Sequence, residues 1–173
     1  MKLRLCILVL FAIASCGVLS ARGAAAPQKD YLSAIEADKI RDAETPSERI
    51  TLFLSFADDR IKKLQYELDH PSQANHEEMV NSLLNAYVGC VDDAADLIQI
   101  GIEKQQNIRK AINLMSSKTK EYIVILQKIP TTAPDAELYK DNLDDAIEGT
   151  QDASREAEDA KKNVAAPPVR RKN

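Results

Sequence analysis

The sequence predicts an all-α fold, an elongated antiparallel helical bundle with coiled-coil-like hairpins and three to four main helices, after an N-terminal signal segment. Apolar residues recur three and four positions apart along most of the chain, which is the spacing of amphipathic helices. The seven prolines fall at the borders of these periodic segments and never inside one, as expected because proline breaks helices. No alternating β-branched run and no Asn-Gly or Asp-Gly turn indicates a β-hairpin.

Residues 1–26 have the order of features that is typical of a secretory signal peptide. Two basic residues precede the apolar run 5–14, and small residues follow at 23–26. Residues 13–16, Ile-Ala-Ser-Cys, also resemble the lipobox of bacterial lipoproteins, in which Cys16 would be acylated. We favour ordinary cleavage over acylation because apolar residues continue past Cys16. We favour cleavage over an uncleaved anchor because the apolar run is shorter than the roughly 20 apolar residues that a membrane-spanning helix needs. All three interpretations predict export, to the periplasm or cell envelope.

Charge argues against a nucleic-acid partner. The chain has 23 basic and 27 acidic residues, a net charge of −4. Residues 1–26 hold three of the basic residues and no acidic one, which leaves 20 basic against 27 acidic residues and a net charge of −7 for the remainder. Phosphate binding needs clustered Lys and Arg. The one dense basic cluster, 170–172, lies in the segment 164–173, which we expect to be a disordered tail.

The predicted helical domain, 27–163, opens with two helices of different length. A short helix is expected over 33–44, where Ser33 and Glu36 can form a capping box. A longer helix follows, with Thr45 as N-cap and a proline at its first helical position. Its apolar stripe is spaced three and four residues apart and predicts burial in a bundle: Ile50, Phe53, Leu54, Ala57, Ile61, Leu64 and Leu68.

From a further capping box at Asn75 and Glu78, the helical pattern continues without proline to Ile129. Apolar positions keep a heptad register over this whole stretch. Two arrangements follow. Either 76–129 is one helix, roughly 80 Å long, or a bend at 101–107 folds two halves together and closes a four-helix bundle. We prefer the single helix because a loop need not preserve the register.

The last helix is expected to begin near Pro134, with acidic residues in its first turn that oppose the positive end of the helix dipole. Its stripe loses apolar volume along the chain: Tyr139, Leu143, Ala146, Thr150, Ala153, Ala157 and Ala160. Alanine buries little area, so we expect this helix to fray after Ala157.

The two histidines supply weak candidates for a metal site. His70 and His76 bracket the turn at Pro71, and with Glu67 and Glu77 they could converge on zinc or copper. The spacing of Glu67 and His70 is that of di-iron bundles, but those proteins need the motif on two helices and here it occurs once. We favour a solvated turn whose histidines cap the helix ends.

No catalytic residue and no cofactor site is assigned. Cys90 and the serines have no histidine near them in sequence, and Cys90 is expected to be a buried, inert thiol. Neither a Gly-x-Ser-x-Gly motif nor a phosphate-binding glycine loop is present. Three pairs of aspartates, at 58–59, 92–93 and 144–145, are expected on solvated helix faces.

These observations predict an exported cell-envelope protein without enzymatic activity, an interaction adaptor or chaperone-like module. Long amphipathic helices with exposed apolar edges predict a protein partner or self-association. Membrane contact is expected only through a lipid anchor on Cys16 or an uncleaved signal segment. The alternative, from another class, is a bundle that binds a small ligand or a metal at the turn from His70 to His76.

Overall fold

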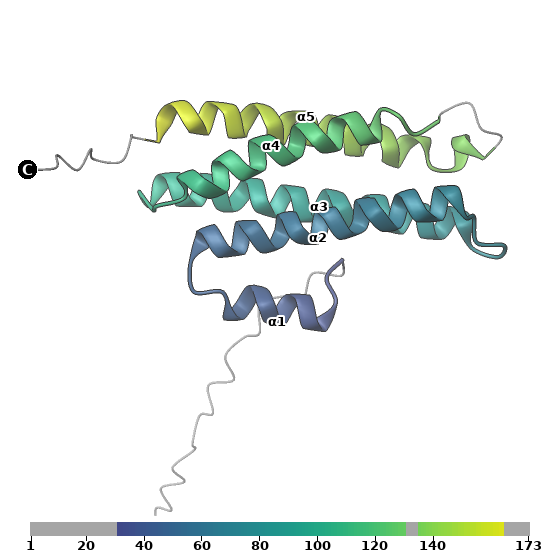
Figure 1. Ribbon diagram of the computed structural model, residues 1–173, viewed down its shortest axis with the longest axis horizontal. Coiled ribbons are helices and arrows are strands. Elements are labelled where there is room, and N and C mark those ends of the chain that lie inside the picture. Colours follow the sequence, from purple (N-terminus) through teal and green to yellow (C-terminus); the bar gives the residue numbers. More distant parts are fainter. Residues whose placement is uncertain (1–30, 131–134, 165–173) are drawn as a thin grey trace, which may run out of the picture.

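The computed structural model describes residues 31–130 and 135–164, and every regular element in these two stretches is helical. The elements follow one another as shown in Figure 1: α1 (Ala34–Asp42), α2 (Pro46–Asp69), α3 (His76–Glu103), α4 (Arg109–Leu126), the 3-10 turn η1 (Ala136–Leu138) and α5 (Lys140–Asn163). The absence of strands from the described stretches confirms the all-α prediction. The predicted signal peptide, Cys16 and the tail from 165 onward lie outside the described residues.

The four long helices form two antiparallel hairpins that lie side by side (Figure 1). In one hairpin α2 packs along α3, and in the other α4 packs along α5. The hairpins meet where α3 lies against α5 and, less extensively, where α2 lies against α4. Although α3 and α4 are consecutive, they touch little, because the chain crosses there from one hairpin to the other. This arrangement confirms the predicted antiparallel bundle, and α1 rests on the outside of α2.

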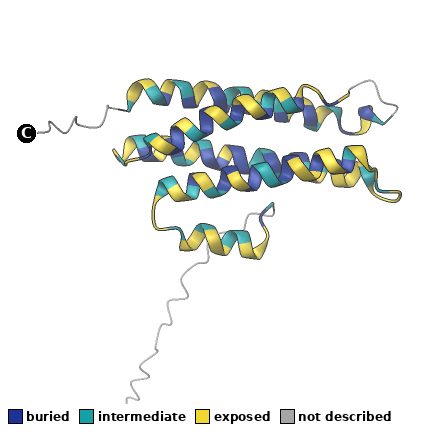
Figure 2. Cartoon of the chain, viewed as in Figure 1, coloured by how far each residue is buried: buried dark blue, intermediate teal, exposed yellow. Residues whose placement is uncertain are grey.

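The core lies between the inward faces of these helices (Figure 2). The predicted stripe of α2 is buried from Ile50 to Leu64, and Leu68 near the helix end is half-buried. Fully burying one large apolar side chain contributes about 1.5–3 kcal/mol, so a stripe of this length accounts for the attachment of α2. The rings of Tyr87 in α3 and Tyr122 in α4 meet edge to face with their centroids 5.5 Å apart. The core is therefore continuous across both hairpins.

Two of the three predicted helix N-caps are formed. Ser33 caps α1 and Thr45 caps α2, and in each case the glutamate three residues later bonds back to the backbone of the cap. Asn75 at the start of α3 makes no side-chain cap bond, so this predicted capping box was wrong. Its ψ is 33°, whereas the two formed caps have extended backbone, the conformation that aims the side chain at the first turn.

The preferred single helix over 76–129 was wrong, and the alternative with a bend is the one observed. The chain turns between Glu103 and Arg109, where Gln105 adopts a positive φ of 53°. The amides of Gln105 and Gln106 donate to the carbonyls of Ile102 and Gly101, which is the Schellman pattern that ends a helix. The heptad register continues across the turn because both halves face one core. A continuous register therefore did not distinguish a helix from a hairpin.

Helix α5 begins later than expected and ends at Asn163, the predicted end of the helical domain. A short 3-10 turn precedes it, and the helix continues through Asn163, so the fraying expected after Ala157 was wrong. All seven residues of the predicted stripe are buried, including Ala160. Polar contacts with α4 hold the final turn in place, since Arg109 donates to the carbonyl of Val164 and Lys161 donates to Ser116 Oγ at 2.5 Å.

Candidate functional site

The predicted candidates gather at one end of the bundle, which we call the turn end. It comprises the last turn of α2, residues 70–75, the first two turns of α3, the last turn of α4, and η1. Here the Nδ1 of His76 lies 2.8 Å from Glu67 Oε1, and its Nε2 lies 3.3 Å from Asp135 Oδ2. Glu67 also accepts hydrogen bonds of 2.8 Å from the amide and the hydroxyl of Ser72. These contacts tie both hairpins and the turn together.

The other two candidates lie apart from this cluster. His70 is exposed and stacks on Tyr66, with ring centroids 4.6 Å apart, and its Nδ1 lies 3.3 Å from the Tyr66 carbonyl oxygen. Glu77 is exposed on the first turn of α3. Within residues 31–130 and 135–164, no group of three His, Cys, Asp or Glu side chains is placed to hold a metal ion. The structure thus pairs Glu67 with His76 and adds Asp135, which the sequence did not indicate.

The cluster of Glu67, His76 and Asp135 connects the two hairpins, and we call it the clasp. Both ring nitrogens of His76 face carboxylates, and the Ser72 hydroxyl donates to Glu67 and not to the imidazole. A serine nucleophile would need a base to accept its proton, and a carboxylate that already bonds an amide and an imidazole is a weak one. These bonds, led by that of the Ser72 amide, lower the pKa of Glu67. The cluster fixes the turn against the bundle.

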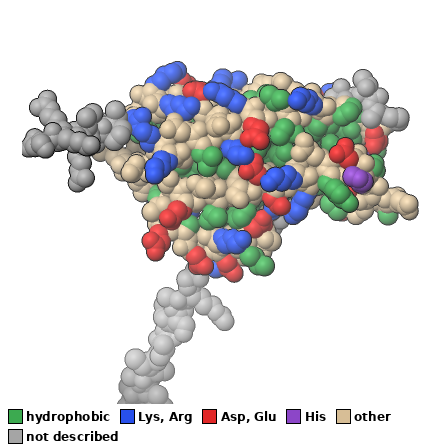
Figure 3. All heavy atoms as spheres, in the orientation of Figure 1, with side chains coloured by type: hydrophobic (Ala, Val, Ile, Leu, Met, Phe, Trp, Pro, Cys, Tyr) green, Lys and Arg blue, Asp and Glu red, His purple; other side chains and the backbone are tan. Residues whose placement is uncertain are grey.

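Beside the clasp, a groove of about 320 Å³ runs between α2 and α3. Its lining combines apolar and basic side chains: Lys62, Lys63, Tyr66, Glu67, Met79 and Leu83. Tyr66 is 66% exposed and Met79 is 38% exposed, although both are large and mainly apolar. Four of the six exposed large hydrophobic residues in the described chain belong to the turn end: Tyr66, Met79, Val124 and Leu138. Figure 3 shows hydrophobic side chains grouped at this end, on the face that it presents.

A second polar cluster is buried in the middle of the bundle. The hydroxyl of Tyr87 lies 2.7 Å from Thr150 Oγ1, which links α3 to α5. The hydroxyl of Tyr122 donates to the Leu54 carbonyl at 3.0 Å and to Asp58 Oδ1 at 2.8 Å, which links α4 to α2. Burial raises the pKa of both phenols, so they remain neutral donors. Each hydroxyl is satisfied within the protein, and the cluster serves to align the helices.

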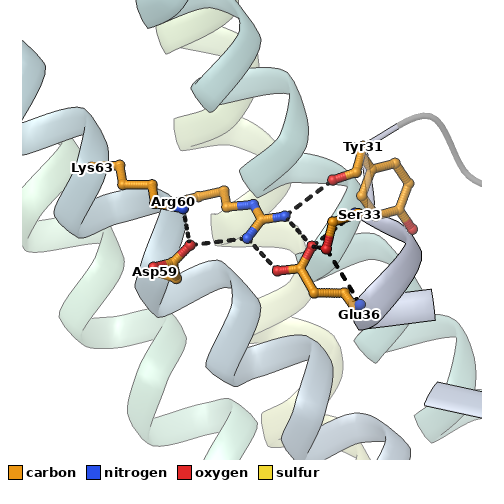
Figure 4. A network of polar contacts seen from close by, with 6 residues as sticks. All are labelled: Tyr31, Ser33, Glu36, Asp59, Arg60 and Lys63. Carbon is orange, nitrogen blue, oxygen red and sulfur yellow. Dashed lines mark hydrogen bonds and ion pairs between the residues drawn. The ribbon is translucent and has the colours of Figure 1, made fainter. Parts of the chain in front are cut away.

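A third cluster attaches α1 to the bundle (Figure 4). The guanidinium of Arg60, which is only 8% exposed, donates to both carboxylate oxygens of Glu36, at 2.5 and 2.7 Å, and to the Tyr31 carbonyl at 3.2 Å. The hydrogen bond from Arg60 is the main reason that the pKa of Glu36 falls to about 2. The Tyr31 ring lies over Gly89, where a Cβ would come within 2.7 Å of it. We call residues 31–42 the strap.

The paired aspartates differ from one another. Asp58 bonds Tyr122 and, at 3.1 Å, the ammonium of Lys118. Asp93 is buried and accepts a hydrogen bond from the Tyr31 hydroxyl, so the expectation of a solvated face was wrong for this residue. Cys90, one turn of α3 earlier, is buried as predicted.

No known protein family, no curated protein and no solved structure shows significant similarity to this chain. None of the helices in the described residues combines the length and the apolar character needed to cross a membrane. The packing of the helices defines the class of fold, an antiparallel helical bundle of two stacked hairpins.

Proposed function

We propose that the protein is an exported helical module that binds a protein partner through its turn end and acts without enzymatic chemistry. One observation carries this proposal: large apolar side chains are concentrated and exposed beside a groove at one end of a charged bundle. Exposed apolar side chains gathered beside a groove are typical of interaction sites. The neighbouring clasp of His76, Glu67 and Asp135 supports it, because it holds the walls of the groove in a fixed position.

Export is part of the proposal and rests on the sequence of residues 1–26. A cleaved leader would release the bundle into the periplasm or cell envelope, and acylation of Cys16 would tether it to a membrane surface. The intact mass of the protein recovered from the envelope separates the cases. A start near Ala26 supports ordinary cleavage, and a mass that includes acyl chains supports the lipid anchor. A full-length mass in the cytoplasmic fraction would contradict export.

A photo-crosslinking amino acid placed at single positions tests the docking surface in the producing cell. We expect a discrete protein adduct from positions 66 and 79, in the groove, and none from position 100. Ile100 is a suitable control because it is also exposed and apolar but lies near the opposite end of α3. Equal adducts at all three positions, or none at any, would contradict a partner site at the turn end.

A further inference from the structure

The geometry points to an amphipathic helix with acidic flanking residues as the partner element that occupies the groove between α2 and α3, an inference that rests on the proposed function. The groove lies between two antiparallel helices. Each wall contributes a pair of lining residues one helical turn apart: Lys62 and Tyr66 on α2, Met79 and Leu83 on α3. This matches the way in which a helix lays apolar side chains, spaced three and four apart, into a groove.

The apolar lining suits a helical stripe. Leu83 is half-buried and forms the inner part of the lining, whereas Tyr66 and Met79 are more exposed. Methionine adapts its shape to different partners, and tyrosine offers a large rigid surface at a low entropic cost. A second helix would cover both side chains and remove their apolar surface from water. The apolar part of the groove therefore supplies affinity for a helix without selecting its charge.

The charge of the groove selects the partner. Lys62 and Lys63 are exposed side by side on the α2 wall. Lys63 pairs with Asp59 at 2.7 Å, but both side chains are largely exposed and such a pair exchanges at little cost. Lys62 takes part in no ion pair within the described residues. Helix α3, the opposite wall, has six acidic residues and no Lys or Arg. An acidic side chain on the partner could thus form an ion pair only with the α2 wall of the groove. This one-sided pairing fixes the orientation of the partner helix.

The surroundings favour a helix over a lipid surface. Beyond the groove the turn end exposes Asp69, Glu77 and Glu78, which would repel an anionic membrane. The groove offers two lysines on one wall, whereas binding to anionic lipids typically uses clusters of about four to eight Lys or Arg. The Glu67 carboxylate also lines the groove, but it already accepts bonds from Ser72 and His76. Lys62 and Lys63 precede Asp69 by seven and six residues along α2, roughly 10 Å, so the acidic residues of a partner helix would face the lysine end of the groove, away from the turn.

Two labelled helical peptides of about four turns test the inference by fluorescence anisotropy with the full chain. They share one stripe of leucines and differ only in the flanking residues, which are Glu in one and Lys in the other. We expect the Glu peptide to bind at least about tenfold more tightly. Tyr66→Glu should abolish binding of both peptides. The double variant Lys62→Glu/Lys63→Glu should reverse the preference, so that the Lys peptide binds more tightly than the Glu peptide. Ile100→Glu and Lys104→Glu, at the other end of α3, should leave binding unchanged.

The outcomes separate the inference from the proposed function. If both peptides bind equally and Tyr66→Glu abolishes binding of both, the docking site stands and the acidic partner is wrong. If neither peptide binds, or if Tyr66→Glu has no effect, the groove is not the docking site. Two further measurements on the same variants identify other occupants. Cosedimentation with phosphatidylglycerol vesicles that is lost in Lys62→Glu/Lys63→Glu would show a membrane. A dimer in sedimentation velocity that Tyr66→Glu dissociates would show a second copy. Either result overturns the inference.

Discussion

Replacing Arg60 with methionine should release the strap while leaving the four long helices folded. Helix α1 has no buried residue of its own, and only its half-buried Ile40 packs against the core, so it depends mainly on the segment just before it and on this one guanidinium. Arg60 bonds both oxygens of Glu36 and the Tyr31 carbonyl, and methionine of similar length keeps the apolar part of the side chain. The strap is also anchored by the buried Leu32, by the Tyr31 ring and its hydrogen bond to Asp93, and by Ile40, which packs against the core.

The structure sets the size of this effect. Removing one partner of a buried ion pair costs about 3–5 kcal/mol. The Glu36 side chain is 14% exposed, and solvent reduces the loss to about 2–3 kcal/mol. Burial of Leu32 contributes about 1.5–3 kcal/mol. The free energy lost with the Arg60 guanidinium is therefore as large as the contribution of the main apolar anchor of the strap. It corresponds to a decrease of roughly 30- to 150-fold in the protection of the α1 amides.

Hydrogen exchange measures this directly. In Arg60→Met, the amides of α1 should exchange faster by that factor, while those of α3 should keep their protection. Arg41→Met is a matched control because, among the residues that the structure describes, Arg41 pairs only with Asp38 and both side chains are more than half exposed, so it should change protection by less than about 0.5 kcal/mol. Unchanged protection of α1 in Arg60→Met would refute the argument, as would a parallel loss in α1 and α3, which would mean that the strap and bundle unfold together.

Four further predictions concern stability. The pKa of Glu36 is lowered to about 2, so the ionised carboxylate stabilises the strap fully above the ordinary pKa of 4.5, and this stabilisation is lost as the pH falls toward 2. Hydrogen exchange of the α1 amides, corrected for intrinsic rates, should therefore become faster at low pH in the wild type. The same change should be absent in Arg60→Met. Gln105→Gly should raise the free energy of unfolding in urea by about 0.5–1 kcal/mol, because glycine adopts the positive φ without strain; a decrease would contradict this. Gly149→Ala, with open space around its Cβ, should stabilise the bundle by about 0.5–1 kcal/mol in the same assay. Gly89→Ala should instead speed exchange in the strap because its Cβ displaces the Tyr31 ring, and equal protection in both glycine variants would count against that contact.

Most features that depend on neighbouring residues could be predicted from the sequence, although the equally local cap at Asn75 did not form. The caps at Ser33 and Thr45 involve bonds over three residues, and both are present. The bend between α3 and α4 could not be predicted from the register, because Gln105 carries none of the usual signals for a positive φ. Glycine or asparagine at that position would have indicated the turn.

The candidate site was predictable only in part, and for a related reason. Glu67 and His76 flank one turn, so their pairing follows from local geometry. Asp135 joins them from another hairpin, which only the packing of α5 against α3 determines. The pairing of Arg60 with Glu36 likewise crosses 24 positions and has no sequence signal. The exposure of Tyr66 and Met79 depends on how α2 packs against α3.

The Arg60 cluster also fixes the point from which the N-terminal segment leaves the bundle. Tyr31 contacts Gly89 and Arg60, each near the midpoint of its helix, so the chain departs from the flank and not from an end. Residues 31–45 are in this way folded back along α2. If the residues before them are attached to a surface, release of α1 would lengthen the tether by up to about 50 Å of extended chain. The bundle would then gain reach toward distant partners without any change in its own structure.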